Sequence, residues 1–246
     1  MKQSSLEKFK NYCVDYKIEL SDAQINCFDL YGEYLKDYNN KVNLTAITDD
    51  DEIVRKHFLD SLIVSKYVNL DNKNVIDIGS GAGFPGVPLK ILISSLNLTL
   101  VDSVGKKVQF LESLKDHINL DYMTINKRAE DLGRDLNFRE RYDVVIARAV
   151  KNLKPLSEYC LPLVKLGGQF VAMKGTKEID SEICDSVDMI NKLGGKLTDD
   201  FRYNLALGDE RAVILVKKIS QTLAKYPRLT SQILKSDNNK KNKSRK

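Results

Sequence analysis

The pattern of apolar and polar residues changes near residue 70. Before that point, apolar side chains recur three and four positions apart, which places them on one face of a helix. Ser21 and Gln24 form a capping-box signature ahead of such a stripe, since each side chain can bond the other residue's free backbone amide. We predict an N-terminal helical domain over residues 1–70, with a loop over residues 38–50 and a third helix beginning near its end.

From residue 73 onward, short β-branched runs alternate with helical patterns. The predicted strands are NVIDI, LTLVD, MTIN, YDVVIA, GQFVAMK and AVILVKK. Alternation of this kind predicts an α/β fold, a mostly parallel sheet with helices on both faces. The late runs GGKLTDDFRYNL and AVILVKK are separated by a polar loop and could pair as a closing antiparallel hairpin.

The first predicted strand runs into a glycine-rich loop, DIGSGAGFPG. Gly81, Gly83 and Gly86 spell G-x-G-x-x-G, which is typical of dinucleotide binding. Asp77 stands two residues before Gly79, so the same loop also spells D-x-G-x-G-x-G. The loop alone therefore leaves open whether it holds the pyrophosphate of a dinucleotide or the amino-acid end of S-adenosylmethionine.

Residues that directly follow the other strands are the next candidates, because ligands bind past the carboxyl ends of strands in a doubly wound sheet. Asp102 ends the second strand, 23 residues beyond Gly79, and a carboxylate there can accept hydrogen bonds from ribose hydroxyls. Asp77 could balance a cationic ligand or order the loop backbone, and its alternative role is a structural acid that caps local amides. Together with the hairpin, these features favour a methyltransferase fold over a dehydrogenase.

Charge is concentrated at the C-terminus. The whole chain of 246 residues carries a net charge of +5, and residues 236–246 hold five basic residues against one acid, so residues 1–235 carry 5 − 4 = +1. Such a tail is typical of an arm that reaches an anionic partner such as nucleic acid, and equally of a solvated terminus.

Between the N-terminal helices and this tail, residues 71–235 would form the methyltransferase domain. Four scattered cysteines and the lack of a long apolar run predict a cytoplasmic protein outside the membrane, and we expect a monomer.

Several longer stretches resemble one known family. They are NLTAITDDDEIVRKHFLDSL, DIGSGAGFPGVPLKI, LVDSVGKKVQFLESL, RAED, YDVVIARAVKNLKPLSEYCLPLVKLGGQFVAMKG and the late YPR. Over about residues 20–230 the chain is similar to the bacterial small-subunit (16S) rRNA guanine-N7 methyltransferase family, formerly called the glucose-inhibited division protein B family. The resemblance implies a Rossmann-like class I fold, S-adenosylmethionine as cofactor, and methylation of N7 of one guanine in the decoding-region loop of 16S rRNA, free or in the 30S subunit. Carried over by position, it implies a donor site that involves Gly79, Phe84, Asp102, Ala129, Glu130 and Arg148, and the glycine loop adds Gly81 and Gly83 to the predicted cofactor-binding residues.

The expected chemistry needs no general base, because guanine N7 already carries a free lone pair at neutral pH. The enzyme must mainly hold N7 and the methyl carbon in line, and oriented proximity can supply about 7–11 kcal/mol. The chain agrees in lacking an N-P-P-Y tetrad and a Pro-Cys nucleophile, and Cys160 lies in an apolar context that favours core packing. We expect Arg148 to be the catalytic residue, by contact with guanine O6, a phosphate or the methionine carboxylate. Its alternative role is a surface ion pair.

Further polar residues keep two interpretations each. His57, Asp60 and Ser61 are spaced to share one helical face and could line the cleft, although a lone histidine is often a core residue. Four lysines on the presumed active face could contact phosphate or be solvated, namely Lys151, Lys154, Lys174 and Lys177. We expect no metal site. Two other functions stay open at this point: methylation of a small molecule or protein, and a non-enzymatic ribosome-assembly factor with a vestigial pocket.

Overall fold

The computed structural model describes residues 1–148 and 151–233. Its helices are α1 (Gln3–Asp15), α2 (Asp22–Asn39), α3 (Asp50–Glu52), α4 (Asp60–Ile63), α5 (Gly86–Leu92), α6 (Gly105–His117), α7 (Ala129–Arg134), α8 (Leu153–Cys160) and α9 (Ile179–Lys192). Its strands are β1 (Asn74–Ile78), β2 (Asn97–Asp102), β3 (Met123–Asn126), β4 (Tyr142–Arg148), β5 (Val164–Gly175), β6 (Gly195–Leu205) and β7 (Asp209–Lys218). Every predicted strand is confirmed.

The seven strands form one sheet in the order β3-β2-β1-β4-β5-β7-β6. The pairs from β3 to β5 are parallel, whereas β7 runs antiparallel to both β5 and β6. The predicted fold class, including the closing hairpin, is therefore confirmed. The strand order reverses between β1 and β4, because the chain builds outward to β3 and then returns to the other side of β1. Open α/β sheets bind ligands at such a switch point.

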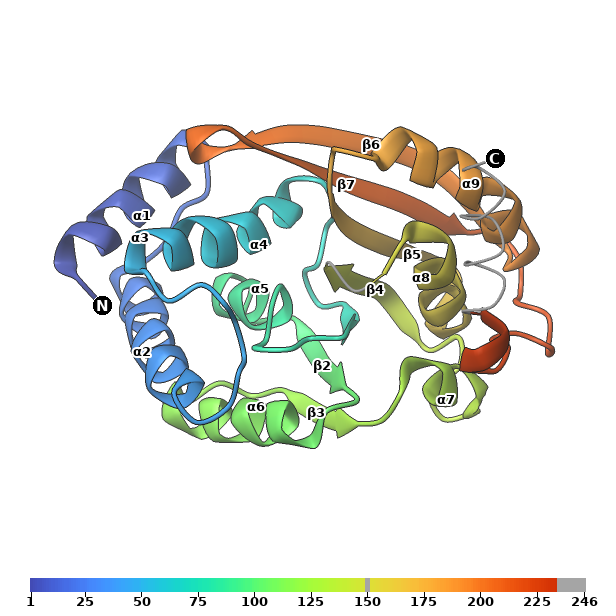
Figure 1. Ribbon diagram of the computed structural model, residues 1–246, viewed down its shortest axis with the longest axis horizontal. Coiled ribbons are helices and arrows are strands. Elements are labelled where there is room, and N and C mark those ends of the chain that lie inside the picture. The colour runs from blue at the N-terminus through green and yellow to red at the C-terminus, as the bar shows by residue number, and fades with distance from the viewer. Residues whose placement is uncertain (149–150, 234–246) are drawn as a thin grey trace.

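Helices cover both faces of the sheet, which makes three layers (Figure 1). Alternate residues of a strand point to opposite faces, and in β4 Val144 and Ile146 pack into one apolar cluster while Val145 and Ala147 pack into the other. The first cluster includes residues of α1, α2, α5 and α6, and the second includes residues of α7, α8 and α9. The N-terminal helices thus share a continuous core with the sheet, and the division of the chain at residue 70 stays a prediction.

The N-terminal helices follow the sequence closely. The capping box is present, since Ser21 Oγ accepts from the backbone N–H of Gln24 and the Gln24 side chain accepts from the N–H of Ser21. The third helix begins at Asp50 as predicted, but it contains a π-helical segment at Ile53–Leu59. This segment turns the residues that follow it relative to a regular helix, and π-turns are frequent at functional sites.

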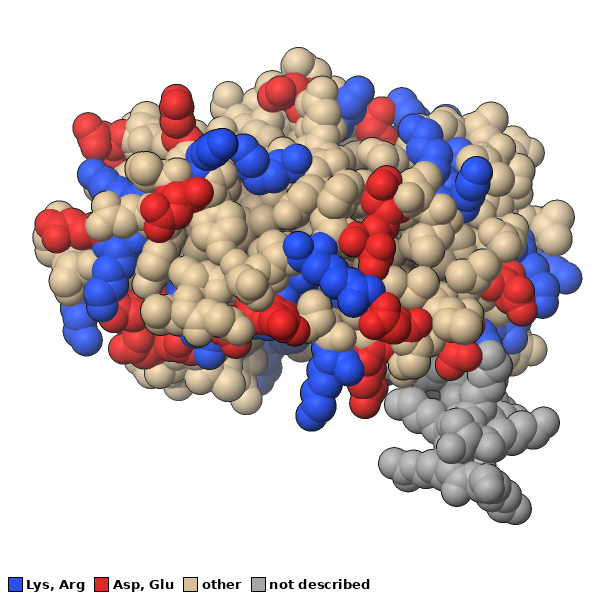
Figure 2. Space-filling view, turned by 90° about the horizontal axis from the view of Figure 1, so that it is seen from above, with Lys and Arg blue, Asp and Glu red and all other residues tan. Residues whose placement is uncertain are grey.

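The described residues include no helix that is both long and apolar enough to cross a membrane. Within the same residues, no group of His, Cys, Asp and Glu is placed to hold a metal ion. Figure 2 shows lysine and arginine side chains interspersed with acidic ones on one face of the molecule. The predicted basic tail, residues 236–246, lies outside the described residues.

Candidate active site

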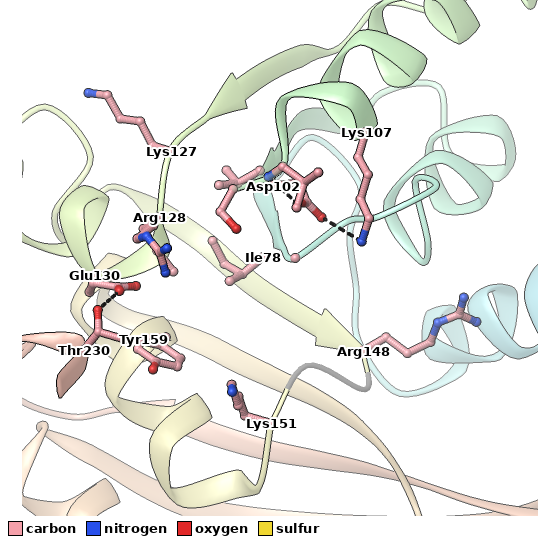
Figure 3. A pocket seen from close by; sticks show the side chains of 15 residues that line it. Ile78, Asp102, Lys107, Lys127, Arg128, Glu130, Arg148, Lys151, Tyr159 and Thr230 are labelled. Carbon is pink, nitrogen blue, oxygen red and sulfur yellow. Dashed lines mark hydrogen bonds and ion pairs between the residues drawn. The ribbon is translucent and has the colours of Figure 1, made fainter. Parts of the chain in front are cut away.

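A cavity of about 440 Å³ opens at the carboxyl ends of β1, β2 and β4, at the switch point of the sheet. Figure 3 shows the side chains that surround it. Its lining comprises Ile78, Gly79, Val101, Asp102, Ser103, Val104, Lys107, Lys127, Arg128, Ala129, Glu130, Arg148, Lys151, Tyr159 and Thr230. Of the eight residues predicted to bind the cofactor, five line this cavity, which we call the donor cavity: Gly79, Asp102, Ala129, Glu130 and Arg148.

The glycine loop shapes one side of the donor cavity. Gly79, Gly81 and Gly83 all have positive φ, at 73°, 57° and 97°, which favours glycine because a Cβ is strained there. Gly79 faces the cavity, whereas a Cβ on Gly83 would lie 2.7 Å from a methyl carbon of Val87 and 2.9 Å from the Tyr31 hydroxyl. Gly83 is thus packed against the core behind the loop, whereas a Cβ on Gly81 would meet only the Gly79 carbonyl oxygen, 3.9 Å away, and neither glycine is part of the cavity lining.

Two carboxylates line the donor cavity, and the first of them, Asp102, is only 6% exposed. Oδ2 accepts from the backbone N–H of Gly81 at 3.0 Å, and Oδ1 accepts from that of Val104 at 2.9 Å. The Lys107 ammonium lies 4.0 Å from Oδ2. These bonds fix the carboxylate, and because a carboxylate offers about four acceptor positions, both oxygens can still accept from a ligand.

The second carboxylate, Glu130, belongs to the first turn of α7 and is also 6% exposed. Ala129 precedes it at the start of the helix and lines the same cavity. Oε1 of Glu130 accepts a hydrogen bond from the Thr230 hydroxyl, which comes from the far end of the chain (Figure 3). The interior of the cavity therefore presents hydrogen-bond acceptors from two sides.

Arg148 ends β4 as predicted, but its guanidinium turns away from the donor cavity toward the N-terminal helices (Figure 3). Nη1 donates to the Lys56 carbonyl at 3.1 Å and to Asp60 Oδ2 at 3.2 Å. The guanidinium also lies 4.9 Å from the centre of the Phe84 ring, within cation–π range. With 14% of its side chain exposed, Arg148 forms a largely buried ion pair rather than a surface one.

Phe84 and His57 stack behind Arg148, with ring centroids 4.4 Å apart and planes 19° apart. His57 Nδ1 lies 3.3 Å from Arg148 Nη2, and Nε2 lies 2.9 Å from Thr45 Oγ1. Because arginine can only donate, Nδ1 accepts and Nε2–H donates to Thr45. Burial, with Arg148 as a second cause, lowers the pKa of His57 to about 3, so the imidazole is neutral. Phe84 stands in this stack, outside the lining of the donor cavity.

A second cavity of about 300 Å³ adjoins the first, and Arg148 lines both. Its other lining residues are Ile47, Lys56, His57, Asp60, Met173, Lys174, Gly175, Tyr203 and Arg211. Asp60, only 5% exposed, accepts from the Tyr203 hydroxyl at 2.9 Å and lies 3.8 Å from Arg211 Nε. We call this the acceptor-side cavity. Its walls come from the N-terminal helices, β5 and the closing hairpin.

The other polar candidates are placed differently. Ser61 is fully buried and donates to the His57 carbonyl, so it serves the helix rather than the cleft. Lys174 lines the acceptor-side cavity and pairs with Glu182 at 2.8 Å, and Lys151 lines the donor cavity. Lys154 and Lys177 line neither of these two cavities.

Asp77 is fully buried beneath the glycine loop. Its Oδ2 accepts from the backbone N–H of Gly86, the first residue of α5, at 2.9 Å, and among the described residues its Oδ1 has no hydrogen-bond partner. Burial raises the pKa of Asp77 to about 7. The contact is that of a structural acid that caps a local amide, which is the alternative role given for Asp77 in the sequence analysis.

Sequence reasoning missed Tyr203, Arg211 and Thr230. Tyr203 and Arg211 lie on the polar hairpin, where alternating residues gave no sign that one face would meet Asp60. Thr230 sits just after the YPR motif, and that motif was the only available signal near it.

The sheet order, the glycine loop and the acceptor-lined cavity define a class I S-adenosylmethionine-dependent methyltransferase fold. Solved structures share it: an O-methyltransferase of Bacillus cereus, in complex with S-adenosylhomocysteine, has a TM-score of 0.58 at 17% identity, covering 87% of this chain and all of that one. A methyltransferase of Pyrococcus furiosus has a TM-score of 0.53 at 12% identity, covering 79% of this chain and 99% of that one.

Sequence comparison gives the family. The model of the GidB family, described as rRNA small subunit methyltransferase G, matches residues 24–197, and the chain belongs to that family. A protein of Acetivibrio thermocellus called ribosomal RNA small subunit methyltransferase G is 45% identical over 215 residues, 87% of this chain and 88% of that protein. A protein of the same name from Lactobacillus acidophilus is 47% identical over 218 residues, 87% of this chain and 90% of that protein. The family resemblance noted from the motifs is thereby confirmed.

Proposed function

We propose that this protein transfers a methyl group from S-adenosylmethionine to N7 of one guanine in the decoding-region loop of 16S rRNA, acting as a monomer on rRNA or the 30S subunit. Membership of the rRNA small subunit methyltransferase G family supports the substrate class. The donor cavity is the observation that supports S-adenosylmethionine as the cofactor. Its buried carboxylates, Asp102 and Glu130, suit the hydroxyl and amino groups of an adenosine.

The start of α5 argues for this cofactor against a dinucleotide. A pyrophosphate binds at a helix N-terminus because the free backbone amides there attract anions. In this protein the first amide of α5, that of Gly86, is already taken by the buried Asp77 carboxyl. A pyrophosphate would therefore lack this amide as a donor, whereas S-adenosylmethionine carries no phosphate and needs no such donor.

The acceptor-side cavity is the proposed place for the guanine. S-adenosylmethionine would supply an electrophilic methyl group from the neighbouring donor cavity. Lys174 and Arg211 line the acceptor-side cavity, and their N–H groups suit guanine O6 or a phosphate. Asp60 holds the Arg148 side chain between the two cavities. Arg148 thus forms part of the wall shared by the cofactor and the guanine at the point where the two would react.

Proton transfer needs no dedicated group in this scheme. Guanine N7 attacks with its own lone pair, and neutral His57 is engaged through both ring nitrogens. Arg148 must not bond N7 itself, since that would occupy the attacking lone pair. Its ion pair with Asp60 keeps the guanidinium directed toward the helices. Catalysis then rests on holding two reactants in line.

The test is methyl transfer from labelled S-adenosylmethionine by the purified protein to three substrates: 30S subunits lacking the mark, naked 16S rRNA, and a mixture of ribosomal proteins. We expect label in the 16S rRNA of at least one of the first two, and loss of transfer for Asp102→Ala. Label in protein alone would contradict the proposed substrate. If Asp102→Ala still methylated the 16S rRNA, the donor cavity would not be the cofactor site.

A further inference from the structure

The residues after β7 pass across α7 and α8, and we call residues 219–233 the C-terminal strap (Figure 1). Arginines at the end of α7 and just beyond it bind the carbonyls of the strap. Arg139 donates to the Tyr226 carbonyl at 2.8 Å and to the Thr222 carbonyl at 2.6 Å, and Arg134 donates to the Pro227 carbonyl at 2.9 and 3.1 Å. The strap is thus fixed to the helix that carries Glu130.

Close packing adds to these bonds. A Cβ on Gly133 of α7 would lie only 2.9 Å from the Pro227 ring, so helix and strap touch directly. Tyr226 and Ile233 are buried in the same apolar cluster as the inner residues of α7 and α8. The strap is therefore part of the core on this side of the sheet.

A second anchor lies on α8. Glu158, only 1% exposed, accepts from Arg228 through the backbone N–H at 2.8 Å, Nε at 2.9 Å and Nη2 at 2.7 Å. Paired bonds between a guanidinium and a carboxylate fix both distance and orientation. Because an unpaired buried carboxylate is costly, this contact holds the strap in place just before Thr230.

Thr230 reaches the donor cavity from this anchored segment. It lines the cavity, and its hydroxyl donates to Oε1 of Glu130 (Figure 3). A single bond to one carboxylate oxygen restricts the plane of the carboxylate and so directs the lone pairs of the other oxygen. Without it, the Glu130 carboxylate would have to be ordered when a ligand binds, which lowers affinity.

We propose that the C-terminal strap is a wall of the donor site and that Thr230 is a positioning residue, which presets Glu130 to accept a hydrogen bond from the nucleoside end of the cofactor. The inference rests on the proposed function, in which the donor cavity holds S-adenosylmethionine. It assigns to the strap a role in donor affinity that is separate from any contact with RNA.

The test is calorimetric titration of the full-length protein with S-adenosylhomocysteine. Thr230→Val removes the hydroxyl at nearly constant volume and should weaken binding about tenfold, the effect of a lost hydrogen bond to a charged group. Thr230→Ser should restore affinity to within about twofold of wild type. Thr124→Val is the matched control, since Thr124 makes the same kind of bond to Glu112, 3.2 Å away on the surface and outside the donor cavity.

Two further readouts separate positioning from folding. Thr230→Val should raise the KM for S-adenosylmethionine while kcat at saturating donor stays near wild type, and its circular dichroism spectrum should be that of the folded wild type. In a double-mutant cycle, Glu130→Ala, which removes the acceptor of the Thr230 hydroxyl, should make the further change Thr230→Val almost without effect. Wild-type affinity in Thr230→Val, or additive losses in the cycle, would overturn the inference. A wild-type protein that does not bind S-adenosylhomocysteine would instead refute the proposed function on which it rests.

Discussion

Replacement of Asp77 by asparagine tests the interpretation of the glycine loop. The wild-type carboxyl is fully buried, accepts from the Gly86 N–H at 2.9 Å, and has a pKa raised by burial from 3.8 to about 7. Asparagine keeps an acceptor for Gly86 but cannot ionise. The two proteins should therefore share the loop geometry and differ in how their stability depends on pH.

The sign and size of the difference follow from the two pKa values of Asp77. Between them the folded protein binds the proton more tightly than the unfolded chain, so the unfolding free energy of the wild type falls as pH rises from 3.8 through about 7. With those values the cost of ionising the buried group is about 2 kcal/mol at pH 5 and about 4 kcal/mol at pH 8. Relative to Asp77→Asn, the wild type should lose about 2–3 kcal/mol across that interval.

Urea unfolding at both pH values measures this difference directly. Asp116→Asn, which changes an exposed carboxylate on α6, is the control and should follow the wild type. Calorimetry should find that Asp77→Asn still binds S-adenosylhomocysteine. A wild-type stability that runs parallel to that of Asp77→Asn from pH 5 to 8 would refute the buried, helix-capping role of Asp77.

Three other perturbations follow from the same geometry. Gly83→Ala should lower the unfolding free energy by about 3 kcal/mol, because its Cβ would be 2.7 Å from Val87 at a φ of 97°; a loss under about 1 kcal/mol in urea unfolding would contradict this. Asp60→Asn leaves the buried Arg148 charge without its partner and should reduce methyl transfer while S-adenosylhomocysteine affinity is kept. Unchanged turnover would show that the ion pair has no part in the reaction. Deletion of residues 236–246 should weaken RNA binding and leave donor affinity unchanged. The slope of log binding constant against log salt concentration should become shallower by about 0.7 for each phosphate that the tail neutralises. An equal fall in donor affinity would show instead that the tail is needed for the folded structure.

Much of the fold could be predicted from the sequence, since strands and helices are written in local periodicity. Each β-branched run became a strand, and the capping box at Ser21 starts α2. The change of pattern near residue 70 marks the end of the N-terminal helices. It did not reveal that their apolar faces pack on the sheet itself, because periodicity identifies a buried face but not what covers it.

Site residues close to strand ends were predictable for a topological reason. Gly79, Asp102 and Glu130 each come just after a parallel strand or at its end, so the sheet gathers them at one edge. Their roles as ligands of the cofactor stay predictions until binding is measured. Phe84 belongs to the same loop, yet it stacks on His57 outside the donor cavity.

Contacts between distant parts of the chain could not be read from local pattern. Arg148 pairs with Asp60, 88 residues away, and Asp60 in turn accepts from Tyr203, 143 residues away. Thr230 bonds Glu130 across 100 residues. Such pairs depend on the register of whole elements, which a single sequence does not specify.

The most direct test of the proposed activity is a map of the methylated base. Purified protein and S-adenosylmethionine are incubated with 30S subunits or 16S rRNA from a strain that lacks the mark, and the RNA is then cleaved chemically at 7-methylguanine. We predict one new cleavage, at a guanine in the decoding-region loop, that requires both protein and cofactor. Methyl incorporation without cleavage at any guanine, or no incorporation into RNA at all, would contradict the assignment.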